Sequence, residues 1–231
     1  MDDGPNRNRN RLNRIGILSM DATLAKQARQ LNLRNGGPNC PIPSIVLMTD
    51  EKRLPDPIPA IIGLPSRSMV IFRHYGLAPA DRSKLAYRVR RTCRQYGHLC
   101  LIADDLALAL HLDADGIHLP EYHIRKTPHA YRQIPRDMLV TSACHRLQTL
   151  HLLALLTPDQ RPDGVLISPV FATESHPDQP GMAFSAFLQR TALCRSLGLI
   201  PIALGGIKPD NVAMLRGSGV ASLAGIGFSA T

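Results

Sequence analysis

Residues able to do chemistry recur at the ends of short apolar runs in this sequence. Asp104 ends HLCLIAD, His145 follows LVTSAC, and Thr173 comes shortly after GVLISPV. A carboxylate can hold a hard cation such as Mg²⁺, an imidazole can move protons near neutral pH, and a hydroxyl can hydrogen-bond an anion. Such groups at several strand ends indicate an enzyme site built from distant parts of the chain.

The segment IALGGIKPDN (202–211) is the strongest local signal. Gly205 and Gly206 follow an apolar run, and we expect a helix over 209–217. Glycine lets the backbone approach a ligand closely, and a helix N-terminus offers free N–H groups to an anion. Together with Gly225 at the end of the last apolar run, this pattern predicts a phosphate-binding cup. The alternative is that the glycines only form a tight turn.

The segment IADDLALAL places Asp104 and Asp105 where a strand becomes a helix. We expect one aspartate to cap the helix and the other, Asp104, to face a pocket where it could hold Mg²⁺. His118, within GIHL, is more typical of a hydrogen-bonded structural residue than of a catalytic base. Neither a metalloprotease motif nor a Walker loop is present.

The elements that must position these residues form a regular series. Apolar runs of strand length alternate with helical stretches from Ser44 onward. The runs cover 44–50, 68–76, 98–104, 116–119, 139–144, 164–170, 200–206 and 220–226. Because the runs are apolar on both faces and separated by helices, they favour a parallel sheet covered by helices. Eight units predict a single (β/α)8 TIM barrel, whose active site lies at the C-terminal strand ends. An open doubly wound sheet is the alternative.

Outside the predicted barrel, which spans 44–231, lies a basic extension over 1–43. Its first twenty residues have the composition of a disordered arm, and 21–33 predicts a short helix with Asp21 as N-cap. The sequence runs only to Thr231 after the eighth apolar run, so we expect a truncated last helix. We hypothesise that helix 21–33 covers the face that this helix would leave open.

The composition excludes several classes of protein. Apolar residues make up 44% and charged residues 19%, which is typical of a globular chain and not of a disordered one. There is no apolar stretch long enough for a membrane span or a secretory signal. Five scattered cysteines without a CxxC pair favour reduced thiols and a cytoplasmic location.

The charge of +9 suits an anionic, phosphorylated substrate. The basic arm lacks aromatic residues on which bases could stack, so nucleic acid is not the expected partner. The sequence leaves open whether the protein forms a homo-oligomer.

Three segments resemble the thiamine-phosphate synthase/TenI superfamily: IADDLALALHLDADGIHLPE (102–121), GVLISPVFAT (164–173) and PIALGGIKPDNVAMLRGSGVASLAGI (201–226). The resemblance implies a (β/α)8 barrel and a role in thiamine biosynthesis. Synthases of this family join a pyrimidine diphosphate to a thiazole phosphate with Mg²⁺ and release pyrophosphate. The implied partners are therefore small phosphorylated thiazole and pyrimidine substrates.

The resemblance also suggests roles for individual residues. It implies Arg73, His145 and His176 as catalytic, Thr173, Gly205, Gly206 and Gly225 as phosphate-binding, and Asp104 as the metal ligand. Several positions depart from the family pattern. Of Q-x-R-x-K after strand two only Arg73 remains, a second acidic metal ligand falls on His123, and a lysine falls on His176. The serine after strand five falls on Ala143, next to Ser142.

A degraded diphosphate site leaves three functions open. The first is a synthase in which His74 and His176, when protonated, partly replace the lost lysines. The second is a TenI-like thiazole phosphate tautomerase with His145 as proton shuttle. The third is a catalytically silent barrel that binds a phosphorylated ligand.

Overall fold

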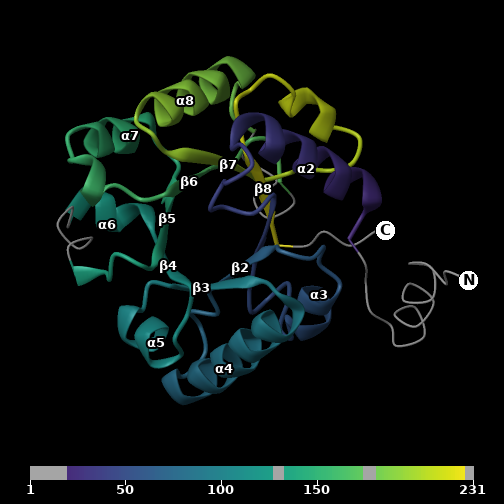
Figure 1. Ribbon diagram of the computed structural model, residues 1–231, viewed down its shortest axis with the longest axis vertical. Coiled ribbons are helices and arrows are strands. Elements are labelled where there is room, and N and C mark those ends of the chain that lie inside the picture. Colours follow the sequence, from purple (N-terminus) through teal and green to yellow (C-terminus); the bar gives the residue numbers. More distant parts are fainter. Residues whose placement is uncertain (1–19, 127–132, 174–180, 227–231) are drawn as a thin grey trace, which may run out of the picture.

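A computed structural model describes residues 20–126, 133–173 and 181–226 of the chain. Eight parallel strands pair in sequence order, and β8 pairs with β1 to close the barrel (Figure 1). The strands are β1 (Ile45–Met48), β2 (Met69–Phe72), β3 (Leu99–Ala103), β4 (Gly116–Leu119), β5 (Leu139–Cys144), β6 (Gly164–Ile167), β7 (Ile200–Leu204) and β8 (Ser222–Gly225). Each predicted run contains one strand, and the predicted (β/α)8 barrel is confirmed.

Helices surround the ring of strands on its outer side (Figure 1). They are α2 (Ala22–Asn35), α3 (Ile58–Ile62), α4 (Pro79–Tyr96), α5 (Leu106–His111), α6 (Glu121–Lys126), α7 (Leu147–Ala154) and α8 (Phe184–Ser196). Two short 3-10 helices, η2 (Pro158–Gln160) and η3 (Val212–Leu215), complete the connections described. The sequence did not predict α3 or α6.

The helix expected over 209–217 is wrong in extent, because only the 4 residues of η3 are helical there. Pro209 has no N–H, and the Asn211 side chain accepts the N–H of Lys208 at 2.9 Å, which stabilises a turn in place of a helix start. Gly217, with φ +81°, ends the segment.

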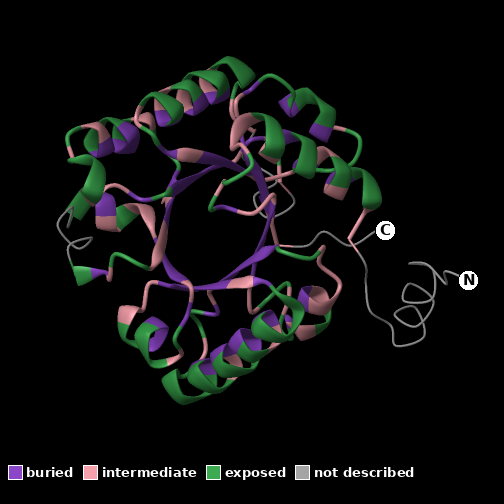
Figure 2. Ribbon diagram, viewed as in Figure 1, coloured by how far each residue is buried: buried purple, intermediate pink, exposed green. Residues whose placement is uncertain are grey.

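Alternation along each strand separates two apolar layers. Val46, Ile71 and Leu101 pack inside the ring, whereas Leu47 and Phe72 pack between the strands and the helices. Figure 2 shows the ring as buried and most surrounding helices as buried on one side only. The alternation also decides which side chain just beyond a strand enters the mouth of the barrel.

The helix α2 covers the outer side of β8 and also contacts β1 and η3. The Asn32 side chain donates to the carbonyl oxygen of Ala221 at 3.2 Å, and Asn35 donates to that of Val220 at 2.7 Å. The hypothesis that the early helix covers this face is confirmed. The predicted disordered arm, apart from Met20, and the predicted truncated last helix lie outside the described residues.

Asp21 caps α2 as predicted, because its Oδ1 accepts the N–H of Thr23 at 2.8 Å and of Leu24 at 2.9 Å. Leu24, Ala28 and Leu31 are buried against the barrel. The helix is thus fixed at its start by a cap and along its length by one apolar face.

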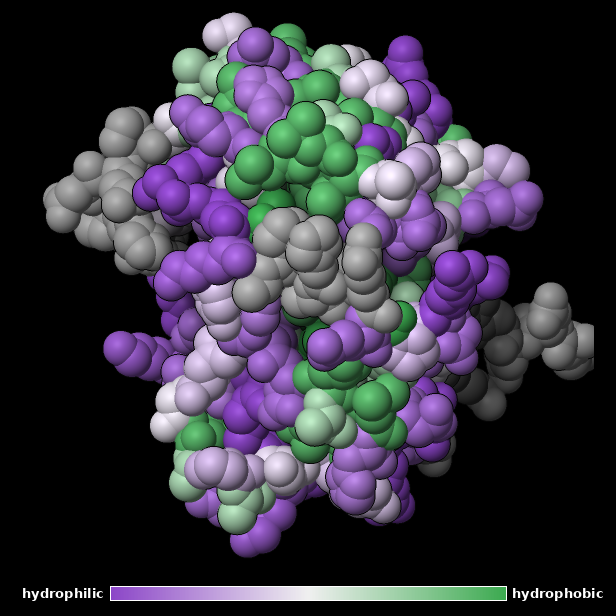
Figure 3. Space-filling view, turned by 90° about the vertical axis from the view of Figure 1, so that its left-hand side faces the viewer, coloured by the Kyte–Doolittle hydropathy of each residue, from purple (hydrophilic) through white to green (hydrophobic). Residues whose placement is uncertain are grey.

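On the outer surface, apolar side chains gather over α7 (Figure 3), where Leu155 is 82% exposed and Leu152 38% exposed. Among the helices that the structure describes, none has the length and apolar character needed to cross a membrane. The homo-oligomer stays an open question.

Candidate functional site

The C-terminal ends of the strands gather the polar groups that the sequence singled out. They divide into two regions of one mouth. We call Thr173, Gly205, Gly206 and Gly225 the glycine rim; it lies at the ends of β6, β7 and β8. We call Asp50, Arg73, Asp104, Tyr122 and His123 the charged arc; it follows β1 to β4.

The glycine rim brings together the four residues predicted to bind phosphate. The register pairs Leu204 with Ala224, so Gly205 lies beside Gly225 at the seam between β7 and β8. A methyl group added at Gly205 would lie 3.3 Å from Cγ2 of Thr173. The residues 169–173 that follow β6 therefore pack directly on the glycine turn.

Both glycines of the turn are sterically required. Gly206 has φ +64°, and a Cβ there would lie 2.2 Å from the carbonyl oxygen of Ala172. Gly205 has φ +107°, and its Cβ would lie 3.1 Å from Cα of Pro169. The Asn211 side chain donates to the Gly206 carbonyl oxygen at 2.7 Å and holds the turn. No other residue type fits this backbone without displacing it.

The turn leaves a donor available for a ligand. Within the described ranges, the backbone N–H of Gly206 has no hydrogen-bond acceptor, whereas the register of β7 and β8 turns the N–H of Gly205 toward the Ala224 carbonyl oxygen. A buried or ligand-facing N–H requires a partner, and an anion can be that partner. The predicted contribution of a helix N-terminus is wrong, since η3 is too short to supply it. Any anion site here depends on the turn and the N–H of Gly206.

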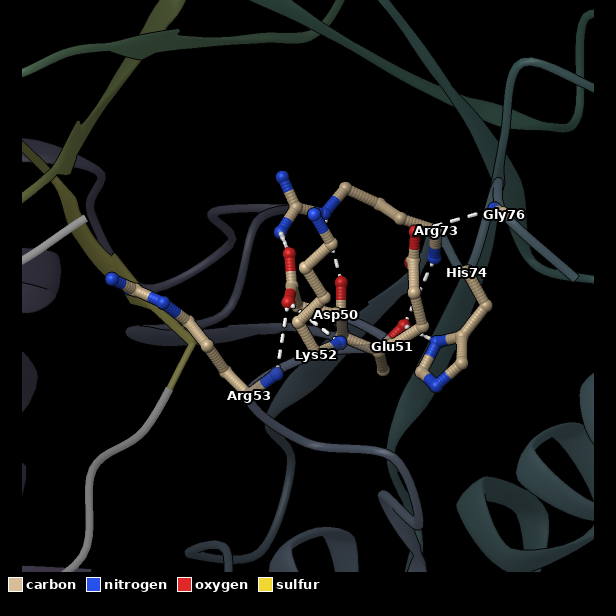
Figure 4. A network of polar contacts seen from close by, with 8 residues as sticks. Asp50, Glu51, Lys52, Arg53, Arg73, His74 and Gly76 are labelled. Atoms are coloured by element: carbon tan, nitrogen blue, oxygen red, sulfur yellow. Dashed lines mark hydrogen bonds and ion pairs between the residues drawn. The ribbon is translucent and has the colours of Figure 1, made fainter. Parts of the chain in front are cut away.

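In the charged arc, Arg73 extends inward and joins the β1–α3 turn (Figure 4). Its Nε donates to the Thr49 carbonyl oxygen at 2.8 Å, and its Nη2 lies 3.2 Å from Oδ2 of Asp50. The other oxygen of Asp50 accepts the backbone N–H of Lys52 at 3.1 Å and of Arg53 at 3.0 Å. The Asp50 carboxylate thus contacts three basic residues, Arg73 through its side chain and Lys52 and Arg53 through their backbone N–H groups.

Lys52 and Arg53 are exposed, and their side chains leave the turn in different directions (Figure 4). Sequence reasoning missed both residues. The available signal was a pair of adjacent basic residues two and three positions after Asp50, where an aspartate at a strand end commonly caps a turn.

His74 does not face the mouth. It is 1% exposed, its Nδ1 lies 2.9 Å from Oγ1 of Thr49, and its ring stacks on Phe72. Strand alternation explains this, because Arg73 follows the inward Ile71 while His74 follows the outward Phe72. The expectation that His74 replaces a lost lysine is wrong.

Asp104 is held by two neighbouring side chains of α6. The Tyr122 hydroxyl donates to Oδ2, and Nε2 of His123 lies 2.5 Å from Oδ1. The hydrogen bond to Asp104 is the main cause that raises the pKa of Tyr122 to about 12. Asp105, by contrast, caps α5 by accepting the N–H of Leu108 at 2.9 Å. The two aspartates divide the roles as the sequence predicted, one as cap and one at the mouth.

These contacts bear on the predicted magnesium ion. Mg²⁺ prefers several oxygen ligands in octahedral geometry. Both oxygens of Asp104 already accept protein donors, and His123 stands where the resemblance implies a second carboxylate. Across the described residues there is no group of three or more His, Cys, Asp or Glu side chains that could hold a metal ion. The residues present do not fit a magnesium site, and the magnesium ion itself stays an untested prediction.

His118 lies inside the ring below the mouth. It is 3% exposed, and its Nδ1 lies 2.9 Å from Oγ1 of Thr141. Burial, together with the nearby Arg73 and His145, lowers the pKa of His118 to about 3. The ring is therefore neutral at physiological pH.

His145 is exposed at the mouth, and its Nδ1 lies 2.9 Å from Oγ of Ser168 on the neighbouring strand end. Glu121 fixes the backbone here, because its Oε1 accepts the N–H of His145 at 3.0 Å, the N–H of Arg146 at 2.9 Å and the Thr149 hydroxyl at 2.6 Å. Glu121 is a positioning residue to which the sequence analysis gave no role.

Ser142 and His176 are the two remaining predicted positions. Ser142 is buried and donates to the Leu119 carbonyl oxygen at 3.0 Å. His176 lies outside the described residues. Of the predicted site residues, Arg73, Asp104, His145 and the glycine rim are those that the structure brings to one end of the barrel.

Comparisons with known proteins agree with this arrangement. Residues 52–228 match the model of a family described as thiamine monophosphate synthase. The chain is 27% identical to a thiamine-phosphate synthase of Alcanivorax borkumensis, covering 77% of this chain and 78% of that protein. It is 30% identical to a thiamine-phosphate synthase of Geobacillus kaustophilus, covering 61% of this chain and 62% of that protein.

The fold is also similar to solved structures. A thiamine phosphate pyrophosphorylase from Pyrococcus furiosus superposes with a TM-score of 0.58 at 18% identity, covering 78% of this chain and 83% of that one. At that identity the likeness concerns the fold alone. The family match spans the barrel strands from β2 to β8 and includes the glycine rim and most of the charged arc. The chain therefore belongs to the thiamine monophosphate synthase family.

Proposed function

We propose that this protein acts in thiamine biosynthesis, where it binds a thiazole phosphate at the glycine rim and joins it to a pyrimidine diphosphate. The observation that carries the proposal is the packed turn at Gly205 and Gly206, in which the N–H of Gly206 has no acceptor among the described residues. A phosphate ester can accept a hydrogen bond from such a donor. The relatives named above, which are thiamine-phosphate synthases, support the same reaction.

The reaction requires the carbon–oxygen bond between the pyrimidine methylene group and its diphosphate to break. The pair of electrons leaves with pyrophosphate, and the thiazole nitrogen then forms the new carbon–nitrogen bond with the resulting cation. Negative charge develops on the leaving oxygen, so nearby fixed cations lower the barrier. Arg73 of the charged arc, together with the exposed Lys52 and Arg53 of the β1–α3 turn, offers three positive charges.

These cations would act where the family pattern has lost its lysines. Asp50 compensates part of their charge, since it pairs with Arg73 at 3.2 Å. Removal of one electrostatic donor from such a site typically costs about 10²–10³ in rate. We therefore expect a slow synthase whose rate depends strongly on Arg73.

A second candidate is a tautomerase that moves a proton on the thiazole phosphate. It is favoured by the pair of His145 and Ser168, 2.9 Å apart at the mouth. The hydroxyl fixes the ring orientation of His145 and leaves Nε2 for a substrate. This reaction needs one phosphate and one proton shuttle, and no diphosphate site.

The deciding experiment incubates the full-length protein with both synthase substrates and, in parallel, with the tautomerase substrate. For a synthase we expect thiamine phosphate and pyrophosphate in equal amounts, with a loss of about 100-fold or more in Arg73→Ala. Lys52→Ala and Arg53→Ala should raise KM for the diphosphate substrate and leave KM for the thiazole phosphate unchanged. Arg91→Ala, an exposed arginine on α4, is the matched control.

Other outcomes separate the alternatives. Turnover of the tautomerase substrate alone, abolished in His145→Asn and kept in Arg73→Ala, would support the second candidate. Calorimetric binding of the thiazole phosphate without either product would support a silent binding barrel. Absence of thiazole phosphate binding would refute the proposal.

A further inference from the structure

Both oxygens of Asp104 accept hydrogen bonds from protein side chains, one from Tyr122 and one from His123. We propose that Tyr122 and His123 take the place of a divalent cation at Asp104, so that this barrel handles its anionic ligand without a metal ion at that position. We call Asp104, Tyr122 and His123 the carboxylate clamp. The inference is independent of which reaction the site performs.

Each oxygen of the Asp104 carboxylate accepts one donor of the clamp. An ionised carboxylate only accepts hydrogen bonds, so the Tyr122 hydroxyl and the Nε2–H of His123 both donate. One serves Oδ2 and the other serves Oδ1, at 2.5 Å for His123. Hydrogen bonds to a charged group are about twice as strong as neutral ones. A cation at Asp104 would have to compete with these two donors for the carboxylate.

Further contacts hold both Asp104 and the two donor side chains of the clamp in place. Asp104 has φ +58°, and its N–H donates to the His118 carbonyl oxygen at 2.9 Å. On the other side, the rings of Tyr122 and His123 stack with centroids 4.6 Å apart. Rotation of the carboxylate toward an incoming cation would therefore break contacts on both elements.

Helix α6 is held from a second direction as well. Glu121, its first residue, accepts three donors at the start of α7. The helix is thus tied to the end of β3 by the clamp and to the end of β5 by Glu121. Tyr122 and His123 stay in place because their neighbours in sequence cannot move independently. The contacts that hold α6, and not only the presence of a histidine at position 123, therefore oppose binding of a cation at Asp104.

The chemical consequence concerns the ligand. A free aspartate at the mouth would repel a phosphate or diphosphate, and a bound Mg²⁺ would normally remove that repulsion. In the clamp, the donors of Tyr122 and His123 offset the charge of Asp104. These hydrogen bonds, and not a metal ion, then reduce the repulsion between Asp104 and an anionic ligand. The cations that then face the ligand are side chains of the protein.

Binding of Mn²⁺, measured by electron paramagnetic resonance without any substrate, tests the inference. We expect no saturable site on the wild-type protein below about 1 mM, the weak end of protein sites for hard cations. The double variant Tyr122→Phe, His123→Asp frees both oxygens of Asp104 and adds a carboxylate. It should bind one Mn²⁺ at least about tenfold more tightly.

The controls make each outcome decisive. His111→Asp adds a carboxylate on exposed α5 away from Asp104 and should leave Mn²⁺ binding unchanged. A wild-type site that Asp104→Asn abolishes would overturn the inference. So would a folded double variant, checked by its circular dichroism, that gains no Mn²⁺. Because no substrate is present, neither result depends on the proposed reaction.

Discussion

The glycine rim and the charged arc lie at the same mouth of the barrel, but they differ in whether backbone or side chains form them. The rim is made largely of backbone: Gly206 has a Cβ position 2.2 Å from another carbonyl oxygen and tolerates no side chain. The arc is made of side chains, and each charge has a protein partner, Asp50 with Arg73 and Asp104 with His123. A site built from backbone resists change by substitution, whereas a site built from side chains can exchange its partners.

This difference explains how a family member can keep one ligand group and alter another. Among the positions that the resemblance marks as changed, His123 lies in the arc. The glycines of the rim match the family pattern. Anion recognition by the turn and charge neutralisation in the arc are therefore separable properties.

The largest effect is expected at the rim. Gly206→Ala places a methyl group 2.2 Å from the Ala172 carbonyl oxygen at φ +64°. We expect a loss of about 3 kcal/mol or more in the free energy of unfolding, from backbone strain together with overpacking. Urea unfolding measures this loss, and calorimetry with thiazole phosphate measures the accompanying loss of binding.

The control for this variant is Gly217→Ala. Gly217 has φ +81°, yet no atom lies within 4 Å of its Cβ position. It should lose only about 1 kcal/mol and bind normally. Equal losses in both variants would show that backbone conformation alone, and not the packed turn, makes the rim special.

The next effect concerns His118, beneath the arc. Its pKa is lowered to about 3 in the folded protein from an ordinary 6.5. Below pH 6.5 the unfolded chain takes up a proton that the folded chain does not. The contribution of His118 to the free energy of unfolding should therefore be fully present above pH 6.5. The free energy of unfolding should then decrease by about 1.4 kcal/mol per pH unit between pH 6.5 and pH 3.

His118→Gln should remove that slope. The measurement compares urea unfolding of both proteins at several pH values, and the difference between them isolates His118 from the other histidines. If both proteins show the same dependence of unfolding free energy on pH, protons reach the His118 imidazole in the folded protein. The surroundings of His118 would then be less tightly packed than its contacts indicate.

A smaller effect is expected at Glu121. Glu121→Ala removes the acceptor of three donors at the start of α7 and should cost about 1–2 kcal/mol, as for loss of a helix cap. Thermal unfolding measures the loss. Glu121→Gln keeps one oxygen acceptor and should lose less than half as much; a loss as large as that of the alanine variant would contradict the capping role.

The smallest effect is expected at Asp50. Asp50→Asn keeps the acceptor for the turn and loses the ion pair with the partly exposed Arg73, so it should cost at most about 1 kcal/mol and less in high salt. Asp56→Asn, which affects the exposed pair with Arg88, should cost nothing measurable. An Asp50 variant as damaging as Gly206→Ala would mean that the arc is as rigid as the rim.

The ring of strands could be predicted from the sequence because its signal is local. Runs such as LVTSAC and GIHL are apolar on both faces, which few other folds allow, and β5 and β4 have the predicted bounds. The segment 209–217 failed because its propensity favoured a helix while the Asn211 side chain stabilised a turn. That competition depends on side-chain geometry and is not visible in periodicity.

The residue types of the site could also be predicted, but not their partners. Asp104 was recognised at a strand end, whereas Tyr122 and His123 belong to α6, a helix that the apolar pattern did not indicate. His74 was misplaced because it is adjacent to Arg73, and one step along a strand reverses the direction of a side chain. Contacts between separate elements need the fold before they can be assigned.

The helix α2 links an early part of the chain to its last strand. Its amide contacts join residues 185 and 189 positions apart, Asn35 with Val220 and Asn32 with Ala221. During synthesis this helix emerges early and must wait for the last strand before it can dock. A chain that begins at Ser44 would contain all eight strands but would lack the helix that covers β8 and contacts β1.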